Sequence, residues 1–124
     1  LARDVRIEDV VSHAIGVKVK GKEGFKVFEF IRKNAKTPLG VSNFVTTERD
    51  RATEFDLEIY QGNSTVVEEC ALVGAVHISG LTSLPRAKQR IELRLHTDRD
   101  GLIHITITDH TSGHRQEHTV QPRS

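Results

Sequence analysis

The sequence predicts an all-β protein, an antiparallel β-sandwich, from a hydrophobic period of two, regularly spaced turn residues and the lack of a sustained helical period. In residues 54–60 the apolar side chains alternate strictly with acidic ones, as in a strand with one face in a core and the other in water. No stretch repeats its apolar residues at the helical interval. The 124 residues suffice for one domain with a single core.

About eight short strands are expected, most of them rich in β-branched residues. In chain order they cover residues 15–20, 25–31, 41–47, 54–60, 71–79, 91–96, 103–108 and 114–120. Gly101 and Gly113 each close a short polar segment where a tight hairpin needs positive φ. Gln61-Gly62-Asn63 ends the strand that reaches Tyr60. These turns favour antiparallel neighbours.

Charge and cysteine content narrow the classes of partner. The 18 basic and 17 acidic residues are interspersed, so no large basic field is expected, and neither nucleic acid nor an anionic membrane is expected as a partner. No apolar run approaches the roughly 20 residues that span a bilayer, and the first four residues do not resemble a signal peptide. Cys70 is alone, which excludes an internal disulfide and favours a cytoplasmic location. Because the sequence starts at Leu1, we expect a longer parent protein.

Catalytic and metal-binding patterns are weak. No Gly-rich phosphate loop or nucleophile–base motif is present, so no enzymatic activity and no catalytic residue are expected. His114 and His118 would lie about 13 Å apart along one strand, while His96 and His104 fall on neighbouring strands and can approach. Two ligands seldom make a site, so no metal is expected. Cys70 has no His or acid beside it in sequence and is interpreted as a structural thiol.

A series of short motifs extends this interpretation. They are Asp9-Val10 with Gly16 seven residues after Asp9, Arg32-Lys33-Asn34 with Thr37-Pro38, Ile59-Tyr60-Gln61-Gly62, Leu72-Val73-Gly74 with Ile78-Ser79-Gly80-Leu81, Pro85-Arg86, Ile91-Glu92-Leu93, Asp98–Ile105 and Ser112-Gly113. In this order and spacing they resemble the peptide-binding domain of heat shock protein 70 (DnaK-type) chaperones, a family that takes part in the stress response. The likeness runs from Asp4 to Val120.

The resemblance implies a sandwich of two four-stranded antiparallel sheets over residues 9–121, with the lid helices of the family absent from this chain. Residues 1–8 would be the remnant of an interdomain linker and residues 122–124 a C-terminal tail. The domain would hold extended apolar segments of unfolded proteins in a channel between loops, through backbone hydrogen bonds and one apolar pocket. Its partners would be unfolded polypeptides, an N-terminal ATPase domain of the same chain and a J-domain co-chaperone. ATP would bind in the parent protein, and this domain would need no cofactor.

The resemblance also assigns residues to sites. The channel would be lined by Val17, Val19, Val45, Thr46, Ala52, Phe55 and Leu57. Lys20 and Glu48 would form an arch over the peptide. Contacts with the ATPase domain would be made by Asp9, Lys33, Asn34 and Pro38.

Several departures from the family pattern bear on this assignment. The arch positions carry Lys20 and Glu48 instead of small or apolar residues, and an ion pair between them is expected to act as a weak latch. Phe55 replaces a smaller β-branched residue and is expected to shrink or fill the central pocket. Residues 22–24 lengthen the neighbouring loop, and residues 5–8 hold fewer apolar side chains than the family linker.

Several of these residues also have a simpler interpretation than the one the resemblance implies. Phe55 is then a plain core residue, Lys20 and Glu48 are solvated charges, and Asn34 and Pro38 only shape their loop. The alternative function is a chaperone-derived interaction domain with lost or narrowed peptide binding. Such a domain would serve a dedicated partner or self-associate through a sheet edge.

Overall fold

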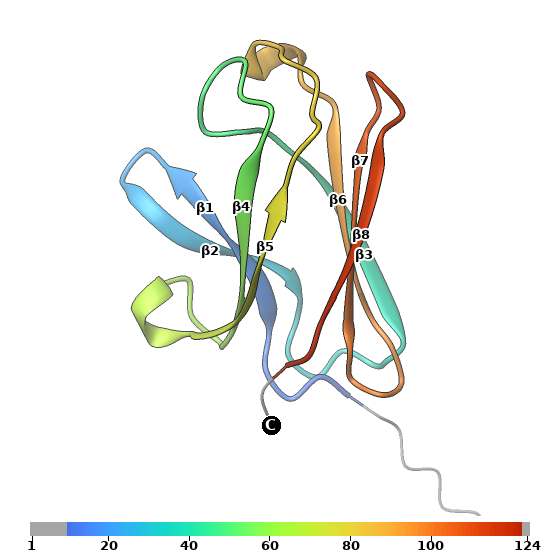
Figure 1. The fold of residues 1–124 in the computed structure, drawn as a ribbon. Coiled ribbons are helices and arrows are strands. Elements are labelled where there is room, and N and C mark those ends of the chain that lie inside the picture. Colours follow the sequence, from blue (N-terminus) through green and yellow to red (C-terminus); the bar gives the residue numbers. More distant parts are fainter. Residues whose placement is uncertain (1–9, 123–124) are drawn as a thin grey trace, which may run out of the picture.

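The computed structural model describes residues 10–122, which form eight strands and two short 3₁₀ helices (Figure 1). In chain order these are β1 (Ile15–Gly21), β2 (Gly24–Ile31), β3 (Leu39–Val45), β4 (Phe55–Gln61), η1 (Val67–Glu69), β5 (Ala71–Ile78), η2 (Arg86–Lys88), β6 (Ile91–Thr97), β7 (Ile103–Asp109) and β8 (Arg115–Val120). All eight expected strands are confirmed, with ends shifted by one or two residues.

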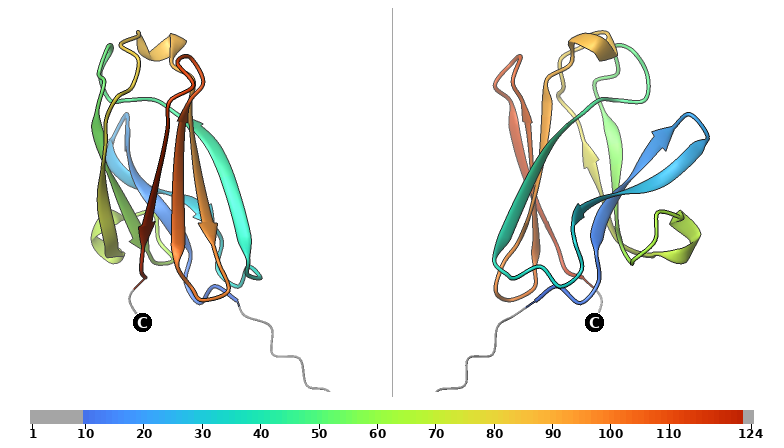
Figure 2. Two further views of the ribbon diagram at one scale, coloured as in Figure 1. Left: turned by 45° about the vertical axis from the view of Figure 1, so that its right-hand side comes forward. Right: turned by 180° about the vertical axis from the view of Figure 1, so that it is seen from behind.

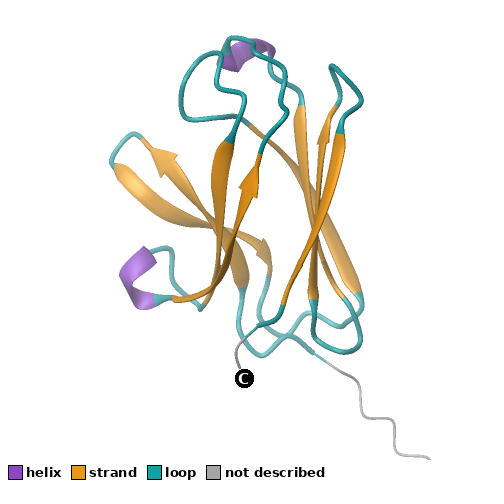
Figure 3. Cartoon of the chain, in the orientation of Figure 1, coloured by secondary structure: helices purple, strands orange, loops and turns teal. Residues whose placement is uncertain are grey.

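The strands form two four-stranded antiparallel sheets that pack face to face, which confirms the predicted sandwich (Figures 1 and 3). The first sheet has the order β2-β1-β4-β5 and the second the order β3-β6-β7-β8. The chain crosses between the sheets from β2 to β3, back from β3 to β4, and finally from β5 to β6. Neither of the two short helices in residues 10–122 is long and apolar enough to cross a bilayer.

The core lies between the two sheets and consists mainly of β-branched residues and leucine, because period-two alternation turns every second side chain inward. On β6 and β7 the alternation is regular, with isoleucine and leucine buried between polar neighbours. The largest fully buried side chains are Val17, Ile31, Ile59, Ile78, Leu93, Leu95, Ile103, Ile105 and Ile107. Both sheets contribute, so neither is stable without the other.

The loops gather at two opposite ends of the sandwich. The β3–β4 loop (residues 46–54) and the β5–β6 loop (residues 79–90) lie at one end, seen at the top of Figure 1. The segment 32–38 and the β6–β7 turn lie at the other end, where residue 122 also lies. Gly101 and Gly113 adopt φ of 84° and 80°, as their hairpin positions predict.

Candidate functional site

The first sheet divides where β1 leaves β4. β1 pairs with β2 at seven positions, from Ile15 opposite Ile31 to Gly21 opposite Gly24. With β4 it pairs at only three, and the last pair is Val17 opposite Ile59. Beyond that pair the β1–β2 hairpin turns away from β4 (Figure 1 and the right-hand view of Figure 2). We call this divergence the fork; residues 18–21 of β1 and 55–58 of β4 are the facing segments of its two arms.

Most side chains on the inner face of both arms, the face that continues the core, are apolar; the exception is the exposed Lys26 of β2, which lies opposite Val19. Val19 follows Val17 on this face of β1, and Phe55 and Leu57 lie on the same face of β4 as the buried Ile59. Val17 and Leu57 are buried, whereas Val19 and Phe55 are half-buried and pack against the core. Four residues that the resemblance assigns to the channel therefore gather at the fork.

Phe28 is an apolar residue of the fork that the sequence analysis missed. It lies opposite Val17 in β2, hence on the same inner face, and is 42% exposed. Its ring meets the ring of Phe30 edge-on at 5.7 Å, and Phe30 belongs to the core. The alternation of Phe28 and Phe30 around Glu29 is the sequence signal that would have found it.

The β3–β4 loop lies at the open end of the fork (Figures 1 and 2). Of the predicted channel residues near it, Val45 and Ala52 are half-buried and Thr46 is exposed. Thr47 is buried, and its backbone N–H donates to Oε1 of Gln89 at 2.9 Å, while Nε2 of Gln89 donates to Oγ1 of Thr47 at 2.8 Å. The reciprocal pair fastens this loop to the β5–β6 loop.

Further hydrogen bonds hold the two loops together. The backbone N–H of Arg86 donates to Oδ1 of Asp50 at 2.8 Å, and that of Arg51 donates to the carbonyl of Leu84 at 2.8 Å. Ser83 Oγ donates to the carbonyl of Arg51 at 3.1 Å. Because these bonds reach main-chain atoms at several positions, the β3–β4 loop has one fixed shape.

A charged cluster crosses the base of the fork on its outer face. Nζ of Lys18 lies 2.6 Å from Oε2 of Glu58, and the hydroxyl of Tyr60 donates to Oε1 of Glu58 at 3.0 Å. Lys18 Nζ also lies 4.6 Å from the centre of the Phe25 ring, a cation–π contact. We call Lys18, Glu58 and Tyr60 the clasp.

The clasp shifts the pKa of each of its members. The hydrogen bond with Glu58 raises the pKa of Lys18 above its ordinary value, and the charge of Glu48 adds to this. The same bond lowers the pKa of Glu58. Burial and the carboxylate of Glu58 raise the pKa of Tyr60. Lys18 and Glu58 are therefore both charged over the whole neutral range.

The predicted ion pair between Lys20 and Glu48 is wrong for this structure. No such pair occurs within 4.0 Å among residues 10–122, and both side chains are exposed. The register of the β1–β2 hairpin places Lys20 opposite Phe25, on the same outer face as Lys18, and it is Lys18 whose pKa the charge of Glu48 raises. The charged contact at the fork is formed instead by Lys18 and Glu58.

The residues assigned to the ATPase-domain contact lie at the end remote from the β3–β4 loop (Figure 1). Lys33, Asn34 and Pro38 are exposed there. Asn34 shapes a turn, with φ of 68° and its N–H donating to the carbonyl of Val11 at 2.7 Å. Asp9, like the linker at residues 1–8, lies outside the described residues.

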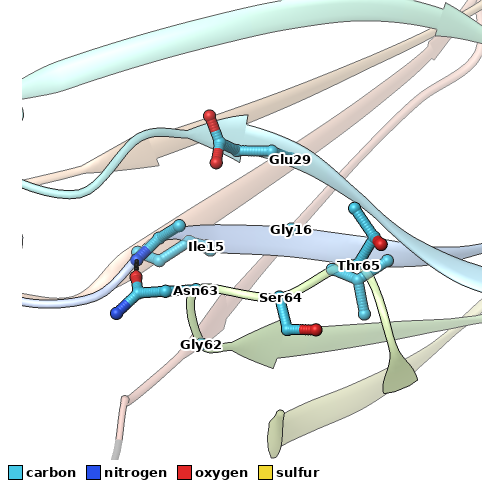
Figure 4. A pocket seen from close by; sticks show the side chains of 9 residues that line it. Ile15, Gly16, Glu29, Gly62, Asn63, Ser64 and Thr65 are labelled. Carbon is cyan, nitrogen blue, oxygen red and sulfur yellow. Dashed lines mark hydrogen bonds between the residues drawn. The ribbon is translucent and has the colours of Figure 1, made fainter. Parts of the chain in front are cut away.

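A shallow pocket of about 90 Å³ lies beside β1, between β2 and the segment 62–65 (Figure 4). Asn63 closes its floor by accepting the N–H of Ala14 at 3.1 Å. The carbonyl of Thr65 accepts the N–H of Val27 at 2.9 Å, so the same segment supports β2 from outside. These contacts stabilise the start of the hairpin.

The described histidines are not part of the fork, although His77 on β5 pairs with Asp56 of the β4 arm at 2.8 Å. His96 and His104 do approach each other across β6 and β7, with ring centres 5.9 Å apart, and Nε2 of His104 pairs with Oδ2 of Asp98 at 2.7 Å. Within residues 10–122 no group of three or more His, Cys, Asp or Glu side chains is arranged to hold a metal ion. The Cys70 thiol is half-buried and donates to the carbonyl of Ser64 at 3.3 Å.

Comparison with known proteins agrees with this architecture. The family model described as "Hsp70 protein" matches residues 1–124. The chain belongs to the Hsp70 family. Over 122 residues it is 33% identical to the chaperone protein DnaK of Thermotoga petrophila, a match that covers 98% of the chain and 20% of that relative. It is 29% identical over 119 residues to the DnaK of Halobacterium salinarum, covering 95% of the chain and 18% of the relative.

The chain thus spans about a fifth of the length of the DnaK relatives that it matches. It is a divergent β-sandwich domain of a DnaK-like chaperone. The identity of about 30% over nearly the whole chain marks it as a divergent member of the family.

Proposed function

We propose that this Hsp70-family domain binds extended apolar segments of unfolded polypeptides between the arms of the fork and the β3–β4 loop. The observation that carries the proposal is the early end of the β1–β4 pairing, after Val17 and Ile59. Past this point neither arm has a strand partner on the side that faces the other. The main chain of an extended segment can donate hydrogen bonds to such edges and accept them, whatever the side chains of the segment.

Apolar side chains at the fork supply the other half of the recognition. Val19, Phe55 and Phe28 lie half-buried or exposed on the inner face, beside the buried Leu57. Side chains of an extended segment alternate in direction, so every second one can turn toward this face. Burying one leucine there contributes about 1.5–3 kcal/mol. The preference is therefore for apolar segments without a fixed sequence.

A peptide titration tests the proposal. We expect a fluorescein-labelled peptide with central leucines to bind, and the same peptide with serines in their place to bind at least tenfold more weakly. Val19→Asp should abolish binding, because it places a charge on the inner face. Val41→Asp is the matched control, since Val41 is another half-buried valine packed on the core, but on β3. Equal binding of the two peptides, or equal effects of the two variants at matched stability, would contradict the proposal.

The parent protein would supply what this domain lacks. We assign ATP binding and hydrolysis to a separate N-terminal ATPase domain, which would contact the exposed segment with Lys33, Asn34 and Pro38. A J-domain co-chaperone would act on that assembly. The domain itself would work without cofactor or catalysis. Adding the purified ATPase domain in trans should perturb the amide NMR signals of residues 32–38, and a lack of change there would contradict the contact.

A further inference from the structure

The clasp joins the two arms directly beyond the point where their main chains stop pairing. Val17 and Ile59 are the final paired residues, and Lys18 and Glu58 are the next residue on each arm. Their side chains meet at 2.6 Å where the main chains have stopped pairing. No second ion pair joins the β1–β2 hairpin to β4 among the residues that the structure describes. The clasp therefore lies at the pivot of the fork.

Three strands meet in the clasp. Tyr60 and Glu58 belong to β4, Lys18 to β1, and the Phe25 ring under the ammonium group to β2. The side chains of Lys18 and Glu58 are only 27% and 28% exposed, so they are partly shielded from water and salt. Glu48 in the β3–β4 loop and Asp56 on β4 also act on this pair through their charges. The hairpin is thus tied to β4 through Lys18, whose ammonium group also contacts β2 through the Phe25 ring.

We propose that the clasp sets how far the fork opens, and so how fast a bound segment enters and leaves. This rests on the proposed function, because the exchange in question is that of the apolar segment. With the clasp formed, the hairpin stays close to β4 and the β3–β4 loop. With the clasp broken, the hairpin swings outward and exposes the inner face. Lys18 and Glu58 are positioning residues, since both lie on the outer face and need not touch the peptide.

A gate and a contact leave different kinetic signatures. Loss of a contact with the peptide speeds dissociation only, whereas loss of a gate speeds association and dissociation together. We expect Lys18→Met and Glu58→Gln each to raise both rate constants for the leucine peptide about threefold to fivefold, as the loss of a half-exposed ion pair implies. Lys18→Met keeps an apolar stem over Phe25, and Glu58→Gln keeps an acceptor for Tyr60. The double variant should change the rates no further than either single one.

Matched controls come from the second sheet. Arg115 and Glu117 on β8 form an exposed ion pair at 2.7 Å, so Arg115→Met and Glu117→Gln remove the same charges away from the fork. They should leave both rate constants unchanged. Molar salt should speed the association and dissociation of the peptide in the unsubstituted domain and have little further effect on the Lys18 and Glu58 variants. If the clasp variants change only the dissociation rate constant, the proposal that the clasp acts as a gate is contradicted.

A distance measurement without peptide separates this proposal from the proposed function. Spin labels on cysteines at Glu23 and Arg49, both exposed, report the span from the hairpin turn to the β3–β4 loop, with Cys70→Ser removing the native thiol. We expect the distance distribution to broaden and lengthen in both clasp variants and to stay unchanged in the β8 controls. An unchanged distance distribution in the clasp variants would contradict the proposal that the clasp sets the opening of the fork, even if the peptide binds. If the leucine peptide does not bind the unsubstituted domain, the proposed function fails, and so does the role of the clasp in peptide exchange. The spin-label distances still decide whether the clasp holds the two arms together.

Discussion

Phe55 offers the sharpest test of how the fork selects its ligand. It lies at the start of β4 opposite Ile78, half-buried, with its ring against the core. If the ring occupies the space that a leucine of the ligand would take, Phe55→Val reopens it. Burying that leucine side chain is worth about 1.5–3 kcal/mol, which corresponds to roughly tenfold to hundredfold tighter binding. Truncation of the half-buried ring should separately lower the folding stability by about 1–2 kcal/mol.

The assay is fluorescence anisotropy of the leucine-centred peptide, with urea unfolding of the same samples. Phe44→Val is the matched control, because Phe44 is 69% exposed on β3, on the outer face of the second sheet. It should leave the peptide Kd unchanged. Unchanged or weaker peptide binding by a cooperatively folded Phe55→Val variant would refute the reasoning, and would make Phe55 an ordinary core residue.

Three further predictions concern stability. Gln89→Ala removes both hydrogen bonds between Gln89 and the buried Thr47, whose hydroxyl keeps its bond to the carbonyl of Arg49, so the free energy of unfolding should fall by about 1–3 kcal/mol and peptide release should quicken; equal release rates would show that the β3–β4 loop keeps its shape without Gln89. Gly16→Ala would place a Cβ 2.5 Å from the carbonyl oxygen of Phe28, and should lower stability by about 1–3 kcal/mol in thermal unfolding, whereas Gly21→Ala, with its nearest atom at 3.5 Å, should be tolerated. Asp109 is buried; burial raises the pKa of its carboxyl, but hydrogen bonds from Thr82 and Thr111 outweigh this and lower it. The stabilising contribution of Asp109 is therefore present above its unfolded-state pKa of about 4 and is lost as pH falls through its folded-state pKa. Asp109→Asn should flatten the acid limb of a pH–stability curve, and parallel curves for the two proteins would contradict this.

The sandwich was predictable because period-two alternation is a local signal. Ile103, Ile105 and Ile107 alternate with polar residues in the sequence and are buried in the structure. Strand ends were less certain, since β3 begins at Leu39, two residues before the expected start, where its pairing with Thr97 begins. That pairing depends on a strand far along the chain.

The fork was less predictable, because it depends on register. Val17, Val19, Phe55 and Leu57 on its inner face were named from the family resemblance, position by position, whereas Phe28 was missed. The ion pair was predicted wrongly: Lys20 and Glu48 looked complementary in sequence, yet within residues 10–122 the structure has no ion pair between them. The pair that does form joins Lys18 to Glu58, which are distant in sequence, and only the β1–β4 register brings them together. Sequence alone gives charges and not the strand positions that match them.

The open edges of the fork also bear on how copies of this domain behave toward one another. An unpaired strand edge is a template for any extended chain, including the arm of a second copy. The hairpin carries Lys20, Lys22 and Lys26, all exposed, along the arm that such a copy would approach. Two hairpins meeting edge to edge would bring these like charges together, which costs free energy that an uncharged apolar client does not incur. By this argument the lysines of the hairpin disfavour self-assembly through the open edge.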